Sequence, residues 1–234
     1  MGAVFKREFR AYFTSPLGYV FCGAFLLFAN LMFCLINVMS SVSDLSNVFG
    51  WMLMVLTFTT FILTMRLFAD EFKQKTDQLL LTAPVKLTSL VMGKFFSALS
   101  VFLLVLVFTL IWPLIISIYG VPNMAAIVGN YFALIAIAGV YISIGMFISS
   151  LTENQFIAAI GALGVSLLYI VMDQVAAIVP IDWLAAVLKW LSVFGRYDNL
   201  AKGLFSVTDI VFYFSTCAIF LFLTVRMLEK KRWA

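Results

Sequence analysis

Six long apolar runs limit the folds open to this chain more than any other feature of its sequence. Each has close to the roughly 20 residues that an α-helix needs to cross the hydrocarbon core of a bilayer. Only 11% of the 234 residues are charged, against about 25% in an ordinary soluble domain. The sequence therefore predicts a single all-α membrane domain over residues 1–234, with six transmembrane helices. The predicted spans are residues 18–39, 51–67, 95–118, 131–151, 156–172 and 210–227.

The basic residues indicate how these spans are oriented. Because Lys and Arg gather in cytoplasmic loops, the side of the membrane that holds most of them is predicted to be the cytoplasm. Six spans place both termini on one side, and that side carries twelve of the fifteen basic residues. We therefore expect both termini in the cytoplasm. The three basic residues on the other side are Lys189, Arg196 and Lys202.

The residue content excludes several kinds of chemistry. Without any His, the chain has no Ser-His-Asp triad and no histidine-ligated metal, and its three Cys residues lack Cys-x-x-Cys spacing. It has no Gly-x-x-x-x-Gly-Lys-[Ser/Thr] motif, so it is not by itself a P-loop ATPase. A dispersed net charge of +4 does not favour nucleic-acid binding. We therefore expect no enzymatic activity, no bound cofactor or metal and no nucleic-acid partner for this chain.

Residues 1–16 are predicted to form an amphipathic helix before the first span. Phe5, Phe9 and further aromatic residues follow one helical face and basic residues occupy the other, until Pro16 ends the pattern. Such a helix lies in the membrane interface, with its basic face toward anionic headgroups or a partner protein. A plain topology anchor is the alternative. The basic residues are Lys6, Arg7 and Arg10.

The longest predicted cytoplasmic segment, residues 66–94, holds nearly a third of the charged residues. Residues 67–81 have a helix-forming composition, and Pro84 ends that pattern. A second helix is predicted to begin near Leu87 and to lead into the third span. Helix, proline break and second helix then form a compact elbow beneath two spans. A solvated loop whose charges only enforce the topology is the alternative.

The segment 173–209 is predicted to be external, yet it is strongly apolar. A run of about 14 residues with Trp183 and Trp190 is too short and too interrupted for a seventh span. We expect one or two helices that re-enter the outer leaflet as a hairpin. An interfacial helix that seals the lipid boundary is the alternative.

Polar residues are scarce within the predicted spans. Ion-coupled and proton-coupled carriers keep acidic residues in the membrane despite the cost of burying them, and this scarcity argues against such a carrier. Asp173 lies at the outer end of the fifth span. Asn30 and Asn37 share a face of the first span, and either line a pathway or hydrogen-bond a neighbouring helix. The candidate pathway residues are thus Asn30, Asn37 and Asp173, and a path without fixed charges suits an amphipathic or lipid-linked cargo.

Three blocks of the sequence resemble the permeases of ABC-2 type transporters. The elbow is similar to the first cytoplasmic loop of that family at residues 65–71, 79–82, 84–85 and 93–95 and at Thr76. Residues 6–19 and 139–155 are similar to a subgroup found in gliding-motility-associated permeases. Two positions depart from the family pattern. Lys75 stands where the family usually has Gly, and Gln78 where it usually has Glu.

The resemblance implies a permease half that moves or extracts an unidentified substrate across a bacterial plasma (inner) membrane. It implies cytoplasmic ABC ATPase subunits that bind ATP and Mg, a second permease half, identical or not, membrane lipid as surroundings and, in some systems, an accessory periplasmic or extracellular subunit. The implied ATPase-coupling residues are Arg66, Asp70, Glu71, Thr76, Leu80 and Pro84, and the interface helix would help to hold the ATPase through Lys6, Arg7, Phe9 and Arg10. A non-transporting scaffold for a motility or secretion complex and a secondary carrier remain as alternatives.

Overall fold

The computed structural model describes residues 1–75 and 86–233, without the side chains of Tyr119, Asp173 and Trp233. This described part consists of helices and their connections. In chain order the helices are α1 (Gly2–Thr14), α2 (Pro16–Phe33), η1 (Cys34–Val38), α3 (Ser46–Thr64), α4 (Ala69–Lys73), α6 (Leu87–Thr109), α7 (Ile111–Tyr119), α8 (Met124–Leu151), α9 (Gln155–Ile178), α10 (Asp182–Leu191), α11 (Phe194–Ala201) and α12 (Val207–Trp233).

Six helical stretches among the described residues are long and apolar enough to cross a bilayer, which confirms the predicted number of spans. They are Pro16–Val38, Ser46–Lys73, Leu87–Ile118, Met124–Leu151, Gln155–Ile178 and Val207–Arg232. Most begin earlier or end later than predicted, and two of them begin at polar side-chain caps outside the apolar run. Asn123 caps α8 by accepting a hydrogen bond from the backbone N–H of Ala126, and Asn154 caps α9 in the same way at Phe156.

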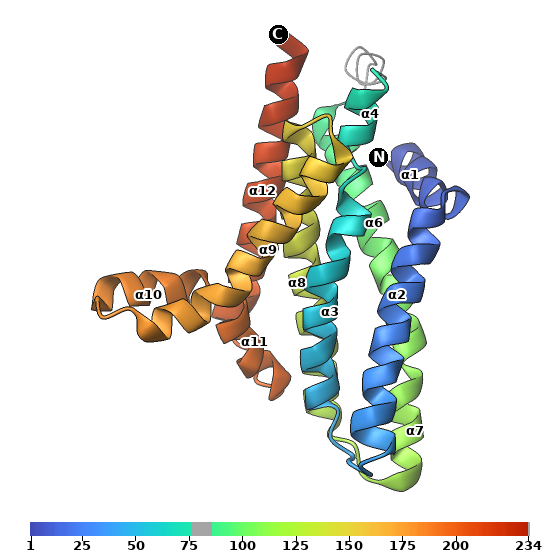
Figure 1. Cartoon of the computed structure of the whole chain (residues 1–234), viewed down its shortest axis with the longest axis vertical. Helices are drawn as coiled ribbons and strands as arrows, with labels where there is room; N and C mark the ends of the chain where they lie inside the picture. Colours follow the sequence, from blue (N-terminus) through green and yellow to red (C-terminus); the bar gives the residue numbers. More distant parts are fainter. Residues whose placement is uncertain (76–85, 234) are drawn as a thin grey trace.

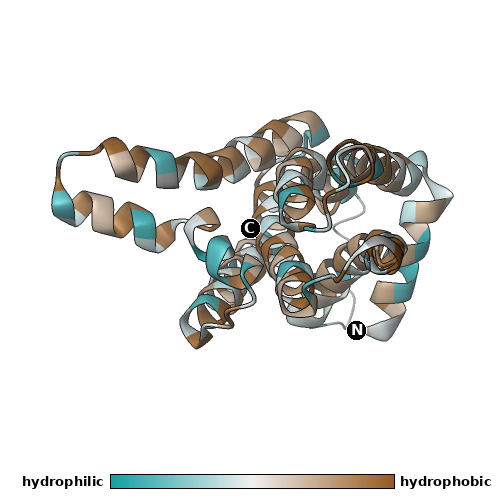
Figure 2. Cartoon of the chain, turned by 90° about the horizontal axis from the view of Figure 1, so that it is seen from below, coloured by the Kyte–Doolittle hydropathy of each residue, from teal (hydrophilic) through white to brown (hydrophobic). Residues whose placement is uncertain are grey.

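Helix α8 lies at the centre of the bundle. It packs against α3, α6, α9, α11 and α12 and is the most buried of the six spans. Helices α2, α9 and α12 leave most of their residues at least partly exposed, which suits contact with lipid tails. Apolar residues accordingly colour most of the span ribbons in Figure 2. Both termini lie at the end of the bundle that carries α1 and α4 (Figure 1).

The third span is broken near its far end. Helix α6 ends at Thr109 and α7 begins at Ile111. Pro113 has no N–H to donate to the carbonyl of Thr109, so the α-helical ladder is interrupted there. The Trp112 indole on α7 donates to Asn30 Oδ1 at 2.9 Å. This bond joins the first and third spans beside the break.

The elbow differs from its prediction. The predicted single helix over residues 67–81 is wrong, because α4 ends at Lys73 and Lys75 then adopts a φ of 55°. A positive φ is the left-handed conformation that commonly ends a helix and favours glycine, which gives the glycine of the family pattern at this position a conformational reason. Three coupling residues, Thr76, Leu80 and Pro84, lie outside the described residues. The second helix, α6, begins at Leu87, as predicted.

Two helices, α10 and α11, lie within the segment predicted to form a hairpin, whose first residues continue α9. Helix α10 packs beside the end of α9, and the two project sideways from the bundle (Figures 1 and 2). Its Trp183 and Trp190 side chains are exposed. Helix α11 then returns to the bundle and packs on α8.

Polar side chains fix α11 in place. The Tyr197 hydroxyl donates to Asn130 Oδ1 at 2.6 Å, and Asn130 Nδ2 donates to the carbonyl of Ala201 at 3.2 Å. Burial raises the pKa of the Tyr197 phenol, which keeps it protonated as a donor. Arg196 pairs with the buried Asp209 of α12 at 3.0 Å. Helix α11 is thereby bonded to both α8 and α12.

Replacing Gly129 by alanine should loosen α11. A Cβ at Gly129 would clash with the backbone carbonyl of Leu200, and backbone atoms cannot rotate away. We expect Gly129→Ala to lower stability by about 1–3 kcal/mol, as overpacking commonly does, and to speed amide hydrogen exchange in α11. Gly164→Ala in α9 is the matched control, since its Cβ meets nothing within 4 Å. Equal thermal unfolding of the two variants in detergent would contradict this account.

Candidate functional site

The second span is interrupted just before α4. Helix α3 ends at Thr64 and α4 begins at Ala69, and residues 65–68 form a turn. Carbonyl groups in the last turn of a helix have no intrahelical partner, and a buried one without a hydrogen bond destabilises the fold. The carbonyls around this turn therefore need donors from elsewhere in the chain.

Three side chains from three other helices supply these donors. They are Tyr12 (α1), whose hydroxyl donates to Leu63 O at 2.7 Å, Ser149 (α8), whose hydroxyl donates to Met65 O at 3.3 Å, and Lys94 (α6), whose Nζ donates to Leu67 O at 2.7 Å. Ser149 Oγ also accepts from the backbone N–H groups of Phe68 and Ala69, both at 3.1 Å. A hydroxyl has one donor and two acceptor sites, so Ser149 is fully used. Contacts distant in sequence thus hold the turn.

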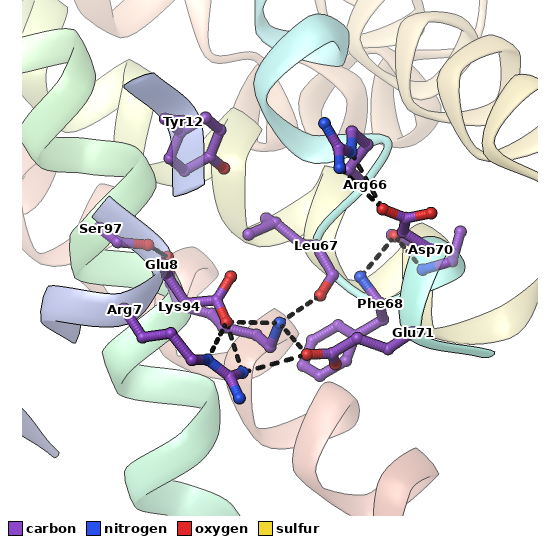
Figure 3. A network of polar contacts seen from close by, with 12 residues as sticks. Arg7, Glu8, Tyr12, Arg66, Leu67, Phe68, Asp70, Glu71, Lys94 and Ser97 are labelled. Carbon is purple, nitrogen blue, oxygen red and sulfur yellow. Dashed lines mark hydrogen bonds and ion pairs between the residues drawn. The ribbon is translucent and has the colours of Figure 1, made fainter. Parts of the chain in front are cut away.

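Lys94 is buried at the centre of this region, with 1% of its side chain exposed. Its Nζ lies 2.8 Å from Glu71 Oε1 and 3.3 Å from Glu8 Oε1, in addition to the carbonyl of Leu67 (Figure 3). Three acceptors match the three N–H groups of an ammonium. A buried charge is tolerated only when it is paired in this way. Lys94 therefore joins α1, α4 and α6 at a single atom.

Arg7 completes what we call the charge cluster, defined as Arg7, Glu8, Glu71 and Lys94. The Arg7 guanidinium lies 2.6 Å from Glu8 Oε1 and 3.3 Å from Glu71 Oε1. Two cations and two carboxylates balance, and the Glu8 and Glu71 side chains are 15% and 17% exposed. Figure 3 shows the four side chains pointing toward one another from α1, α4 and α6. The cluster is a set of matched charges that links α1, α4 and α6, with Lys94 buried and Arg7 exposed at its edge.

A glycine lets α1 come close enough for these contacts. A Cβ at Gly93, directly before Lys94, would lie 2.9 Å from Val4 Cγ1 on α1. A larger residue there would push α1 away from α6. The Gly93-Lys94 pair thus supplies both the close approach of the two helices and the charge that is buried where they meet.

Two further contacts bind α4 to the remaining helices at this end. Asp70 accepts from Arg66 at 2.9 Å and from Gln155 Nε2 of α9 at 2.7 Å. Lys231 Nζ of α12 lies 3.4 Å from the ring centroid of Phe72. With Ser149 of α8 and the charge cluster, α4 is bonded to α1, α6, α8, α9 and α12. A helix of five residues is therefore the common contact of five others.

The structure brings together some predicted site residues and separates others. Arg66, Asp70 and Glu71 gather at α4, and Arg7 reaches Glu71 from the interface helix. The other predicted residues of that helix do not join the cluster, since Lys6 and Arg10 are exposed and the Phe9 ring packs between those of Phe5 and Phe13.

The three candidate pathway residues do not form one site. Asn30 bonds Trp112 of α7, which is the neighbouring-helix role, and Asn37 donates to the carbonyls of Val42 and Asp44. Asp173 lies in α9, and its side chain is outside the described part of the chain. Asn30 thus joins two spans, and Asn37 holds the chain that follows its own span.

Several residues of the site were not predicted from the sequence. Lys94 had a signal, because it is a lone charge within an otherwise apolar stretch. Ser149 and Tyr12 had none, since a serine near a helix end and a tyrosine on an amphipathic helix are ordinary there. The buried Asn130 that holds α11 was likewise missed, because it stood just before a predicted span.

The comparisons with known proteins agree with this helical membrane architecture. Residues 3–229 match the family model of the ABC-2 family transporter proteins. A search of curated proteins found no match. Permeases of this family are typically non-catalytic transmembrane subunits and generally pair with ABC ATPase subunits. Because the match spans nearly the whole chain, this multi-pass membrane protein belongs to the ABC-2 transporter family.

Proposed function

We propose that the chain is the transmembrane half of an ATP-driven transporter, which moves or extracts an amphipathic or lipid-linked substrate. The observation that carries this proposal is the convergence of five helices on α4. A displacement of α4 reaches all of them, because each has a hydrogen bond, an ion pair or a cation–π contact with α4. Such a helix can turn a local push into a rearrangement of the spans.

The proposal includes an orientation. Most Lys and Arg residues lie at the end that carries α4 and both termini, and the positive-inside rule makes that end cytoplasmic. An ABC ATPase, with its ATP and Mg, would then meet the chain at α4. Helices α10 and α11 would lie at the outer side, as a hairpin re-entering the leaflet. A second permease half and a bacterial inner membrane complete the proposed setting, and residues 6–19 and 139–155 support the gliding-motility-associated group.

The charge cluster suggests how a displacement of α4 by the ATPase is transmitted to the spans. Glu71 lies on α4, and its carboxylate faces Lys94 on the third span and Arg7 on α1. Its part in coupling is therefore to hold α4 to the spans from within, while exposed residues of the elbow meet the ATPase. Removing its charge should loosen that link without removing the surface that the ATPase touches.

Glu71→Gln tests the proposal. The chain is reconstituted in lipid nanodiscs with the ABC ATPase subunit that co-purifies with it, and ATP turnover is measured with and without the chain. We expect the wild-type chain to change turnover, and Glu71→Gln to reduce that effect about five-fold or more while the complex still assembles. Asp198→Asn, which removes an exposed carboxylate from α11, is the matched control.

Three outcomes would count against this function. If no P-loop ATPase co-purifies, or if turnover ignores the chain, the chain is better explained as a scaffold. Transport by the chain alone, driven by an ion gradient, would make it a secondary carrier. If Glu71→Gln changes ATP turnover no more than Asp198→Asn does, the charge cluster does not couple α4 to the spans.

A further inference from the structure

Around α4, the charged side chains that face inward include all the carboxylates, whereas the exposed ones are basic. The carboxylates of Glu8, Asp70 and Glu71 face inward, with 15–17% of each side chain exposed, and all three are paired with cations. Lys73 at the end of α4 and Lys86 before α6 are exposed instead. Among the described residues of α1, α4 and the start of α6, the carboxylates are thus paired inward, and the exposed charges of α4 and of Lys86 are basic. Two exposed acids remain at this end of the bundle, Glu229 of α12, which is paired with Arg226, and Glu153 in the turn between α8 and α9.

The end of α12 extends this basic surface. Five of the seven residues from 226 to 232 are charged, which makes these turns unsuited to the hydrocarbon core. Figure 1 shows the end of α12 standing beside α4 and reaching further from the bundle than α1 does. Lys231 faces inward onto the Phe72 ring, whereas Lys230 and Arg232 are exposed. The two elements therefore form one surface.

We propose that α4 and the end of α12 together form a basic docking face, and that its occupant is an acidic surface of the ATPase subunit. We call it the α4–α12 face. This inference rests on the proposed function and adds to it the chemistry of the contact and the part of α12. The exposed cations of the face are Lys73, Lys75, Lys86, Lys230 and Arg232.

The position of the face favours a protein over lipid headgroups as its occupant. Helix α1, with its aromatic face and basic residues, has the character of the interfacial helix, and α4 and the end of α12 reach beyond it (Figure 1). Cations that lie beyond the membrane interface are out of reach of the lipid headgroups and accessible to a cytoplasmic partner. Opposite charge on that partner would speed its association and fix its register.

The contact between the two elements has a mechanical consequence. The ammonium of Lys231 lies 3.4 Å from the ring centroid of Phe72, close enough for a cation–π interaction. A partner that binds both elements would therefore move the second and sixth spans together. Helix α12 is therefore a second element, beside α4, through which ATPase binding can move a span.

Lys230→Glu/Arg232→Glu tests the α4–α12 face without touching Lys231. Affinity for the same ATPase subunit is measured with the chain in nanodiscs of phosphatidylcholine alone. We expect a loss of about ten-fold at about 0.1 M salt, shrinking toward about two-fold at about 0.5 M, because salt screens exposed charges. Lys189→Glu/Lys202→Glu, with the same charge change in exposed residues elsewhere in the chain, should leave the affinity unchanged.

Further variants separate the outcomes. Lys230→Gln/Arg232→Gln should lower the affinity for the ATPase subunit about three-fold. This variant replaces the charge-reversed one if the latter does not fold. If both variants bind the ATPase subunit as tightly as the wild type does, and the wild-type chain still changes ATP turnover, the α4–α12 face is overturned and the proposed function stays intact. A loss seen only when phosphatidylglycerol is added assigns the face to anionic lipid and overturns the inference.

If Lys6→Glu/Arg10→Glu alone weakens binding of the ATPase subunit, α1 is the docking site. Failure of the wild type to bind any ATPase removes both proposals.

Discussion

Lys94→Met is expected to destabilise the protein by about 3–5 kcal/mol, the range for removing one partner of a buried ion pair. The methionine fills a similar volume but donates no hydrogen bond. Glu71, Glu8 and the carbonyl of Leu67 would each lose the ammonium that now lies within 3.3 Å. Two carboxylates would then lie close together with only the exposed Arg7 to balance them. Thermal unfolding in detergent measures the loss.

Two comparisons isolate the buried charge as the cause. Lys86→Met, eight residues earlier, removes an exposed lysine from the start of the same helix and should change stability little. Adding Glu8→Gln and Glu71→Gln to Lys94→Met removes the uncompensated carboxylates, so the triple variant should regain part of the loss. If Lys94→Met unfolds at the same temperature as Lys86→Met, the cluster does not brace the fold.

The sequence predicted the spans because hydropathy alone decides which runs can cross a bilayer. It placed their ends less well. Asn130 stood just outside the predicted fourth span, yet α8 begins at Met124 and continues through it. The amide of Asn130 is satisfied by Ala126, Ala201 and Tyr197, and two of those partners lie about 70 residues away. A polar residue lowers the hydropathy of the sequence and so marks the end of a predicted span. The helix continues through that residue when the fold supplies its hydrogen-bond partners.

The candidate site shows the same division between local and distant contacts. The bond from Arg66 to Asp70 joins residues four apart on the chain and follows from their spacing. The contacts of Lys94 join helices 23 and 86 residues away, at Glu71 and Glu8, and depend on how α1 crosses α6. The resemblance to the family located the elbow, but it did not indicate that Glu71 faces inward. That orientation is set by packing.

Ser149→Ala should have the next largest effect, although it removes only one oxygen atom. Its hydroxyl serves three backbone groups at the turn between α3 and α4, namely the carbonyl of Met65 and the N–H groups of Phe68 and Ala69. Each buried backbone group left without a partner costs about 1–3 kcal/mol. We expect a loss of at least about 2 kcal/mol and a smaller stimulation of the ATPase, because α4 would no longer be held to α8.

Ser150→Ala is the matched control for this substitution. The Ser150 hydroxyl, one residue further along α8, donates only to the carbonyl of Phe147 in its own helix, at 2.6 Å. Its loss should therefore cost less than about 1 kcal/mol. Amide hydrogen exchange gives a local readout, since Ser149→Ala should expose the N–H groups of Phe68 and Ala69 and Ser150→Ala should not. If both variants protect these amides as the wild type does, the turn is held by its backbone alone, and a push on α4 would reach α8 by some route other than Ser149.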